Sequence, residues 1–253
     1  MPTEKTLDYI KPKFTGDEQI VKAFFTLKNA DRFNENGKIP GLNLGFSTRE
    51  DRSQIDKNRS FLFDELGMNT KWIARGSQVH SNRVRYVIHG GLFDRTDGLI
   101  TNIPGLTLAI QVADCAAVLL ADKKNKVIGA VHAGWRGAAG RILPNTIHLM
   151  KKHGADQENM EAFISPCISL KHFEVGEEVA SQFPDEFVDR TSFEKPHVDL
   201  KAFLKNEMTE RGIPESQIEV DPGCTYGDEE HFYSYRREDD QSGRMFGLIQ
   251  LNY

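Results

Sequence analysis

Cysteine is scarce in this sequence of 253 residues, which has only Cys115, Cys167 and Cys224. The three are an odd number and lie far apart in the chain, so they are poor material for the disulfide framework that stabilises many small secreted domains. The roles left for them are metal ligand, nucleophile or small buried apolar residue.

A basic surface and a long apolar run are missing as well. The net charge is -5 with acidic and basic residues well mixed, so no basic face is available to neutralise the phosphate backbone of a nucleic acid. No apolar segment approaches the ~20 residues needed to cross a bilayer. The N-terminus, MPTEKTLDYIKPKF, lacks the basic start and apolar run of a signal peptide. We therefore expect a cytoplasmic protein with neither nucleic acid nor membrane as a partner.

The chain also lacks internal repeats, low-complexity tracts and linkers rich in Pro, Gly or Ser. Its length and ordinary apolar content of 39% predict one catalytic domain over residues 1–253. Polar residues 28–41 predict a surface loop. Strands outnumber helices and the two interleave, so the predicted fold is α/β or α+β, with a mixed, largely antiparallel sheet and helices packed outside it. Strands are expected at 20–27, 71–80, 83–90, 106–122 with an interruption, 127–134 and 243–253, and helices at 53–68, from 138 to 153, at 173–183 and at 199–212.

The interruption of the apolar segment 106–122 at Asp114 and Cys115 is unusual for a buried sheet. A turn at 123–126 returns the chain, which predicts that Cys115 lies beside His132 at neighbouring strand ends. His80, in the sequence QVH, supplies a third ligand of suitable softness. Two imidazoles and one thiolate can hold zinc and leave its fourth position open to activate water or polarise a substrate. The sequence therefore predicts an enzyme with these three residues as metal ligands and catalytic groups.

Less specific interpretations exist for each of these residues. A lone cysteine or histidine of this kind is more often a buried or hydrogen-bonded core residue than a ligand, although the combination of three weakens that interpretation. Asp114 has two equally weighted roles, either a carboxylate that orients a ligand imidazole or a turn former bonded to backbone.

The run HAGWRG predicts an anion site. Gly134 and Gly137 allow close backbone approach, and the helix expected to begin after Gly137 presents free N–H groups and the positive end of its dipole. Arg136 would add a bidentate donor for phosphate or carboxylate. The alternative is a tight turn with Trp135 in the core and Arg136 in a structural ion pair.

Two further segments concentrate reactive side chains. Aromatic rings beside arginines in segment 224–244 could stack a nucleobase and hold a phosphate, or form an ordinary half-buried strand with solvated charges. In segment 164–176, Cys167 and His172 are weaker candidates for chemistry. The residues concerned in the first segment are Cys224, His231, Tyr233, Tyr235, Arg236, Arg237 and Arg244.

From about residue 20 to the C-terminus, the succession GLNLG, QVHS, DGLIT, ADC, HAGWRG, SPCIS, FEVG, CT and SYRR resembles a bacterial family. This family, YfiH-like, was once called polyphenol oxidase or multicopper laccase and is now regarded as purine nucleoside phosphorylases. The resemblance implies a zinc site at His80, Cys115 and His132. It also implies phosphorolysis of adenosine, inosine, guanosine and methylthioadenosine, with deamination of adenosine at the same site. The implied fold is similar to that of a group of proteins classed as cysteine hydrolases, which includes the toxin domain of cytotoxic necrotizing factors.

Several positions depart from the family pattern while the three ligands are intact. Ser81 follows the histidine of QVH, Ala117 stands where proline is common, Ser165 and Pro166 replace glycine and proline, and His172 stands where cysteine is frequent. The family's N-terminal Thr-Arg-x-Gly-Gly motif is reduced here to Thr26, Leu27, Lys28 and Asn29, so that loop lacks the arginine and glycines of the motif. Candidate contacts to nucleoside or phosphate are Asn43, Gln78, Asp114, Arg136, Arg236 and Arg244, in a monomer or homodimer.

Three other functions compete with the phosphorylase. A multicopper phenol oxidase needs many histidines in His-x-His pairs, and this chain has eight histidines with no such pair, although a Cys-His-His site could bind copper. A metal-free hydrolase would use Cys115 as nucleophile and His132 as base. A non-catalytic interaction protein would keep the three ligands as a structural metal site.

Overall fold

The computed structural model describes residues 7–16, 20–33 and 37–252. The start of the N-terminal segment, part of the loop at 28–41 and the last residue of the expected C-terminal strand lie outside these residues. The rest of that loop separates strand β2 (Val21–Thr26) from helix α1 (Arg52–Glu65) without helix or strand, as predicted. Within the described residues, no helix combines the length and apolar character needed to cross a bilayer.

The strands form two six-stranded sheets rather than the one sheet that we expected. The first has the order β1 (Tyr9–Ile10), β2 (Val21–Thr26), β14 (Met245–Leu251), β7 (Thr107–Val112), β3 (Ile73–Gly76) and β5 (Gly91–Phe93). The second has the order β13 (Ile218–Val220), β10 (Met160–Ile164), β8 (Ala116–Asp122), β9 (Val127–Ala133), β6 (Gly98–Thr101) and β4 (Val84–Tyr86). A two-stranded sheet pairs β11 (Val188–Asp189) with β12 (His197–Val198). Antiparallel pairs outnumber parallel ones in both large sheets, as predicted.

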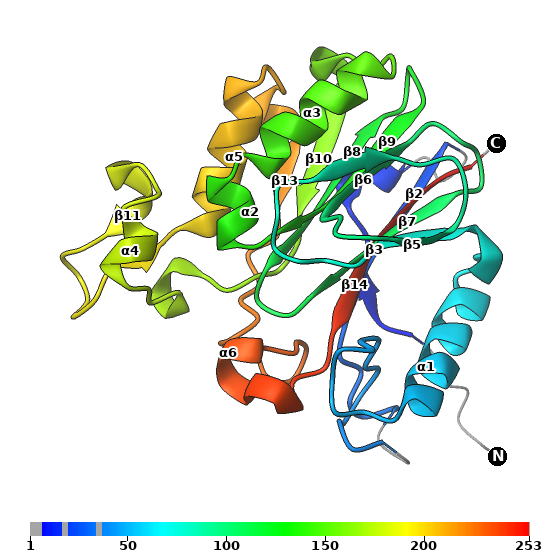
Figure 1. Ribbon diagram of the computed structural model, residues 1–253, viewed down its shortest axis with the longest axis horizontal. Coiled ribbons are helices and arrows are strands. Elements are labelled where there is room, and N and C mark those ends of the chain that lie inside the picture. The colour runs from blue at the N-terminus through cyan, green and yellow to red at the C-terminus, as the bar shows by residue number, and fades with distance from the viewer. Residues whose placement is uncertain (1–6, 17–19, 34–36, 253) are drawn as a thin grey trace.

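The helices lie outside the two sheets (Figure 1). They are α1 (Arg52–Glu65), α2 (Trp135–Ala139), α3 (Ile142–Lys152), α4 (Glu177–Ala180), α5 (Leu200–Glu210) and α6 (Tyr235–Glu238). Short 3₁₀ helices lie at Lys13–Gly16, Thr70–Trp72, Gln157–Asn159, Leu170–His172, Asp185–Phe187, Glu215–Gln217 and Asp239–Gln241. The result is a single α/β domain.

Strand β8 shows why the sheets pack face to face. Its residues alternate, so that Val118 and Leu120 join the core beneath α3 and α5, while Leu119 and Ala121 join the core between the sheets. A strand covered on both faces needs apolar side chains at every position. A third core packs α1 against the outer face of the first sheet. The continuous apolar segment 106–122 is therefore two buried strands, β7 in one sheet and β8 in the other.

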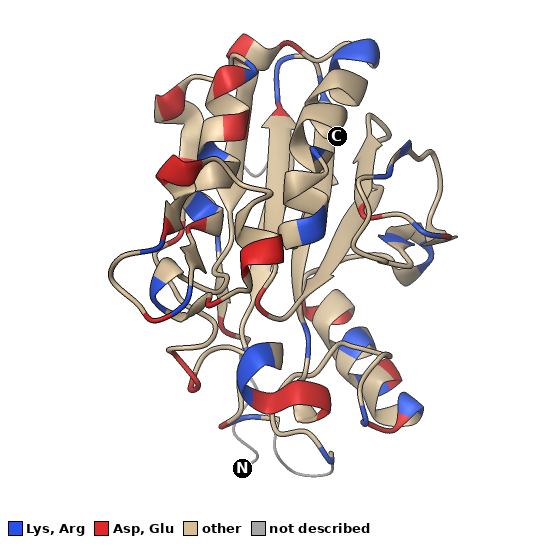
Figure 2. Ribbon diagram, turned by 60° about the vertical axis from the view of Figure 1, so that its left-hand side comes forward, with Lys and Arg blue, Asp and Glu red and all other residues tan. Residues whose placement is uncertain are grey.

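Several expected elements have the predicted ends. The Asp199 carboxylate caps α5 by accepting the Ala202 N–H at 3.0 Å, and Gly212 follows that helix with a φ of +88° that favours glycine. Helix α1 and the hairpin of β8 and β9 also lie where the sequence placed them. Charges of both signs are spread over helices and loops, and the strands carry few of them (Figure 2).

Other expected elements were wrong in extent or kind. The strand predicted at 71–80 ends at Gly76, and the one at 83–90 keeps only Val84–Tyr86. The helix predicted at 173–183 is reduced to Glu177–Ala180. The half-buried strand considered within 224–244 is absent, because the described chain there forms loop and α6 before β14 begins at Met245.

Candidate active site

Cys115 and His132 meet because the β8–β9 hairpin pairs the strand ends beside them. Ala116 lies opposite Ala133 and Ala117 lies opposite His132. Cys115 directly precedes β8, after Asp114 turns the chain with a φ of +78°. The predicted neighbourhood of Cys115 and His132 is thus confirmed.

His80 lies in the loop after β3, where the backbone wraps around the buried carboxylate of Asp97. Oδ1 of Asp97 accepts the His80 N–H at 3.0 Å. Oδ2 accepts the N–H groups of Val79 at 3.3 Å and Ser81 at 2.8 Å, and the Ser81 hydroxyl at 2.6 Å. These bonds hold His80 in a left-handed conformation with a φ of +59° and direct it toward the hairpin.

The same carboxylate also orients the second histidine. Oδ1 of Asp97 lies 2.8 Å from Nδ1 of His132, and the Asp97 carbonyl accepts the His132 N–H at 2.7 Å. A carboxylate bonded to one ring nitrogen fixes the tautomer and leaves the other nitrogen for a metal. Burial alone would raise the pKa of Asp97, but hydrogen bonds from His132 and Ser81 lower it to about 2. The role that we considered for Asp114 therefore belongs to Asp97, which the sequence analysis missed although it opens the motif DGLIT.

Electrostatics favour a charged Cys115 and His132. Burial raises the pKa of the Cys115 thiol, but the charge of His132 and hydrogen bonds from His132 and His80 bring it down to about 6. Burial lowers the pKa of His132, but the Cys115 thiolate and the bond to Asp97 raise it to about 9. The rings of His80 and His132 meet edge to face with centroids 4.8 Å apart. At neutral pH the site thus holds a thiolate, which is the form that binds metal or acts as nucleophile.

The three side chains fit a single metal ion. Their ligand atoms all lie within 4.8 Å of one another, and within the described chain no other group of three or more His, Cys, Asp and Glu side chains is placed to hold an ion. Gly134 leaves room for them, because a Cβ there would lie 2.8 Å from Sγ of Cys115 and 3.1 Å from Cδ2 of His80. Two imidazole nitrogens and one thiolate sulfur are a set that zinc accepts, and His132 releases its proton when it binds the metal.

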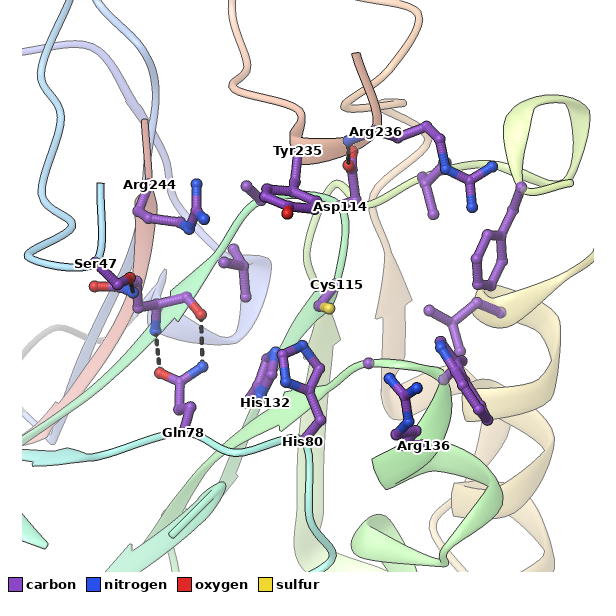
Figure 3. Close-up of a pocket in the computed structure, with 18 residues that line it drawn as sticks. Ser47, Gln78, His80, Asp114, Cys115, His132, Arg136, Tyr235, Arg236 and Arg244 are labelled. Atoms are coloured by element: carbon purple, nitrogen blue, oxygen red, sulfur yellow. Dashed lines mark hydrogen bonds between the residues drawn. The ribbon is translucent and has the colours of Figure 1, made fainter. Parts of the chain in front are cut away.

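A pocket of about 460 Å³ opens beside these ligands (Figure 3). Its volume lies in the range of small-molecule sites. Aromatic side chains line it together with three arginines and one acid, Asp114, so positive charge dominates. The lining includes His80, Cys115, His132, Arg136, Arg236, Arg244, Gln78, Gln111, Ser47, Trp135, Phe173 and Tyr235.

Arg136 reaches the pocket by a different local structure from the one predicted. The helix does not begin after Gly137, because α2 already starts at Trp135. The chain then turns at Arg141, with a φ of +69°, before α3 starts. Arg136 lies in the first turn of α2, and its guanidinium carbon is 4.2 Å from the centre of the Trp135 ring. Among the described residues it makes no ion pair, so the structural ion pair considered for it is not found.

Asp114 is hydrogen-bonded to Arg236 and does not orient a metal-ligating imidazole. Oδ1 of Asp114 accepts the Thr225 hydroxyl at 2.7 Å, and Oδ2 accepts the Arg236 N–H at 2.6 Å. The Arg236 side chain donates to the Glu174 carbonyl at 2.9 Å. Asp114 therefore ties Thr225 and the first turn of α6 to the start of β8, next to Cys115.

The remaining candidates, Gln78, Asn43 and Arg244, are held by hydrogen bonds to neighbouring residues. The Gln78 carboxamide is bonded to the backbone of Gln111 in both directions, at 2.7 and 2.8 Å. Asn43 is buried outside the pocket lining, and its Oδ1 accepts the Arg244 N–H at 3.0 Å. Nη1 of Arg244 donates to the carbonyls of Ser242 and Gly243, both at 2.8 Å. Burial lowers the pKa of Arg244.

Other residues singled out in the sequence lie away from the pocket lining. Burial raises the pKa of Cys167 to about 12, so this thiol is inert. Tyr233 is buried and donates to the Pro40 carbonyl, and Arg237 donates to loop carbonyls. His231 pairs with Asp228. Cys224 and His172 contact each other instead, with 3.3 Å between Sγ and Nδ1.

Known proteins match nearly the whole chain. A family model described as multi-copper polyphenol oxidoreductase laccase matches residues 22–252. A purine nucleoside phosphorylase of Deinococcus radiodurans is 38% identical over 218 residues, which cover 85% of this chain and 84% of that protein. Adenosine deaminase RL5, from an unknown prokaryotic organism, is 27% identical over 253 residues, covering 93% and 96%. The crystal structure of the hypothetical protein YfiH of Bacillus licheniformis matches with a TM-score of 0.89 at 26% identity, covering 99% of this chain and 98% of that one. The predicted YfiH-like fold is thereby confirmed.

Proposed function

The chain belongs to the multi-copper polyphenol oxidoreductase laccase family, and from this membership we propose that it is a zinc-dependent purine nucleoside phosphorylase that also deaminates adenosine. The expected nucleosides are adenosine, inosine, guanosine and methylthioadenosine. One observation carries the proposal: the cluster of His80, Cys115 and His132 lines a ligand-sized pocket rich in arginine and aromatic side chains. The names of relatives that match over most of the chain agree with it.

The three ligands would hold the zinc, with Asp97 fixing the ring of His132 and the backbone of His80. When bound there, zinc supplies a Lewis acid with an open coordination position. The family description mentions several copper ions, but the one suitable cluster among the described residues offers three ligands. All eight histidines lie in the described chain, and a multicopper centre would need more of them gathered in one place.

The side chains of the pocket suit a purine nucleoside and phosphate. Trp135, Phe173 and Tyr235 line it, and aromatic rings of this kind stack on a nucleobase. We place phosphate at Arg136, whose guanidinium makes no ion pair in the described chain and lies beside the ligand cluster (Figure 3). Arginine binds phosphate through paired N–H donors. Arg236 lines the same pocket, and its backbone N–H donates to Asp114.

Phosphorolysis in this pocket transfers the ribose from the purine to phosphate. A phosphate oxygen bonds to C1′ as the bond from C1′ to the purine nitrogen breaks. Arg136 holds the attacking anion in place, which converts a reaction between two molecules into one within a complex. In deamination, water attacks C6 of adenine and ammonia leaves, so the arginine that holds phosphate is not needed for the attacking group.

Asn43 and Gln78 act in this proposal through their neighbours. Asn43 positions Arg244 by accepting its backbone N–H. Gln78 fastens the loop that carries His80 to Gln111 at the end of β7. Each is thus a positioning residue rather than a direct contact to the nucleoside.

A second candidate function is a metal-free hydrolase. Cys115 and His132 form a thiolate and imidazolium pair, as their pKa values of about 6 and about 9 indicate. A thiolate beside a protonated histidine is an activated nucleophile. Metal content separates the two functions, because the phosphorylase should contain close to one zinc per chain when purified without a histidine tag. A non-catalytic protein in which the metal site is only structural would retain that zinc but would not convert any nucleoside.

The experiment is incubation with adenosine, with and without phosphate, followed by chromatography. The proposal expects adenine and ribose-1-phosphate only when phosphate is present, and inosine in both conditions. Hypoxanthine should follow as inosine is itself cleaved. A stoichiometrically zinc-loaded protein that forms none of these products would contradict the proposal.

A further inference from the structure

Two side chains that the proposed function leaves unused, His172 and Cys224, meet outside the pocket lining. Cys224 begins the segment CTYG, and His172 belongs to the segment SLKHF, 52 residues earlier. Nδ1 of His172 lies 3.3 Å from Sγ of Cys224. The His172 ring also stacks on Tyr226, with centroids 4.9 Å apart, which holds it against the sulfur.

Backbone groups complete the surroundings of this sulfur. The N–H groups of Ser169 and Gly227 donate to Sγ of Cys224, both at 3.4 Å. The Ser169 hydroxyl lies 3.3 Å from Nδ1 of His172. Donors aimed at a sulfur stabilise a thiolate more than a thiol, because only the thiolate is negatively charged.

The electrostatics agree with this geometry. Burial by itself raises the pKa of Cys224, but hydrogen bonds from Ser169 and from the Gly227 backbone outweigh it and lower the pKa below the usual value. Burial and the nearby Lys171 lower the pKa of His172, so its ring is a neutral base near neutral pH. Cys224 is half-buried rather than enclosed, which leaves it within reach of a small reagent.

We propose that Cys224 is a modification site, a nucleophilic thiol that reacts with peroxides to form a sulfenic acid. His172 accepts the thiol proton, and the sulfur attacks one oxygen of hydrogen peroxide. The S–O bond forms as the O–O bond breaks, so sulfur loses two electrons and the peroxide is reduced. The departing hydroxide takes the proton from His172, and the products are cysteine sulfenic acid and water.

The other two cysteines provide internal comparisons. Cys167 is fully buried with a pKa of about 12, so it should resist the same reagent. Cys115 belongs to the ligand cluster, so its labelling rate is recorded separately. The proposal for Cys224 does not depend on purine chemistry, and its test uses no nucleoside.

The experiment treats the folded protein with limiting hydrogen peroxide and traps sulfenic acid with dimedone. Mass spectrometry of the peptides then gives a labelling rate for each cysteine. Cys224 should be labelled at least about tenfold faster than Cys167, since one pKa unit changes the thiolate fraction about tenfold below the pKa. In urea-unfolded protein the two rates should converge and Cys224 should react more slowly than in the folded state.

The variant His172→Phe keeps an aromatic ring to stack on Tyr226 and removes the nitrogen beside the sulfur. It should slow labelling of Cys224 about fivefold or more, because the base that accepts the thiol proton is gone. His153→Phe is the matched control, because His153 stacks on Tyr86 at 3.8 Å and no cysteine is among its described contacts. This control should leave the rate unchanged.

Either of two results would overturn the proposal. One is a Cys224 labelling rate in the folded protein that is no higher than in the unfolded chain. The other is a folded His172→Phe protein that labels as fast as His153→Phe. If His172→Phe does not fold, the comparison of folded and unfolded wild-type protein decides alone.

Discussion

Replacing Asp97 with Asn removes the acceptor that organises two of the three proposed ligands. Oδ1 of Asp97 accepts from His80 and His132, and Oδ2 accepts from Val79 and Ser81. An amide has one acceptor oxygen, so in either orientation at least two N–H donors face its NH₂ group. A buried donor left without a partner costs about 1–3 kcal/mol. We therefore expect Asp97→Asn to lower the free energy of unfolding of the zinc-free protein by about 2–6 kcal/mol.

The same substitution should weaken zinc binding. Loss of a carboxylate that orients a ligand histidine lowers metal affinity or activity about 10–100-fold, and chelator competition measures that affinity. Asp114→Asn is the matched control, because Asp114 bonds to Thr225 and Arg236 and not to an imidazole. It should keep the zinc affinity within about threefold, since its bonds lie outside the ligand set. If Asp97→Asn binds zinc as tightly as the control, Asp97 does not organise the site.

Three other substitutions test separate parts of the account. Arg136→Ala should raise the KM for phosphate, because about 1.5–3 kcal/mol of charged hydrogen bonding is lost, and it should affect deamination less. Steady-state kinetics of both reactions check this. An equal loss of activity in phosphorolysis and deamination would indicate a structural role for Arg136. Cys115→Ala should lose both zinc and purine turnover, because two neutral imidazoles remain; metal analysis that still finds one zinc per chain with normal turnover would exclude the proposed site. Glu207→Gln should stabilise the fold by about 2 kcal/mol well above pH 7 and have little effect below pH 4.5. The reason is that burial raises the pKa of Glu207 from 4.5 to about 7. In the described structure, Oε2 of Glu207 also has no hydrogen-bond partner. The folded protein binds that proton more tightly than the unfolded chain, so ionisation destabilises it as pH rises through this range; urea unfolding at both pH values measures the difference, and equal effects at both would contradict the assignment.

The sequence predicted the central hairpin because its local signals agree. Apolar segments on both sides of a polar turn, together with the break at Cys115, were enough to place that residue beside His132. The cap at Asp199 and the glycine at 212 likewise fixed both ends of one helix. Patterns of this kind are local, so they survive without knowledge of the tertiary fold.

The division into two sheets could not be predicted in the same way. Strands β7 and β8 are both buried on two faces, and their periodicity is the same whether they share a sheet or not. The short helix α2 was missed because a glycine-flanked run is typical of a turn, and tertiary packing overrides that local preference. The helix α6 was missed for a related reason, since the aromatic residues of this segment favour a strand.

Asp97 was missed because its role arises only from contacts distant in sequence. The residues that wrap around it lie 16 to 18 positions earlier, and His132 lies 35 positions later. Taken alone, an acid before a buried strand is indistinguishable from a turn former. The sequence signal that could have identified Asp97 is its position at the start of DGLIT, one of the segments on which the family resemblance rests.

The most direct test of the central claim is a zinc titration of chelator-stripped protein with adenosine and phosphate present. The rate of adenine release should be negligible without metal, rise in proportion to added zinc, and reach its plateau at about one zinc per chain. Full adenine release from the stripped protein, unchanged by added zinc, would contradict the account and leave Cys115 and His132 as a metal-free pair.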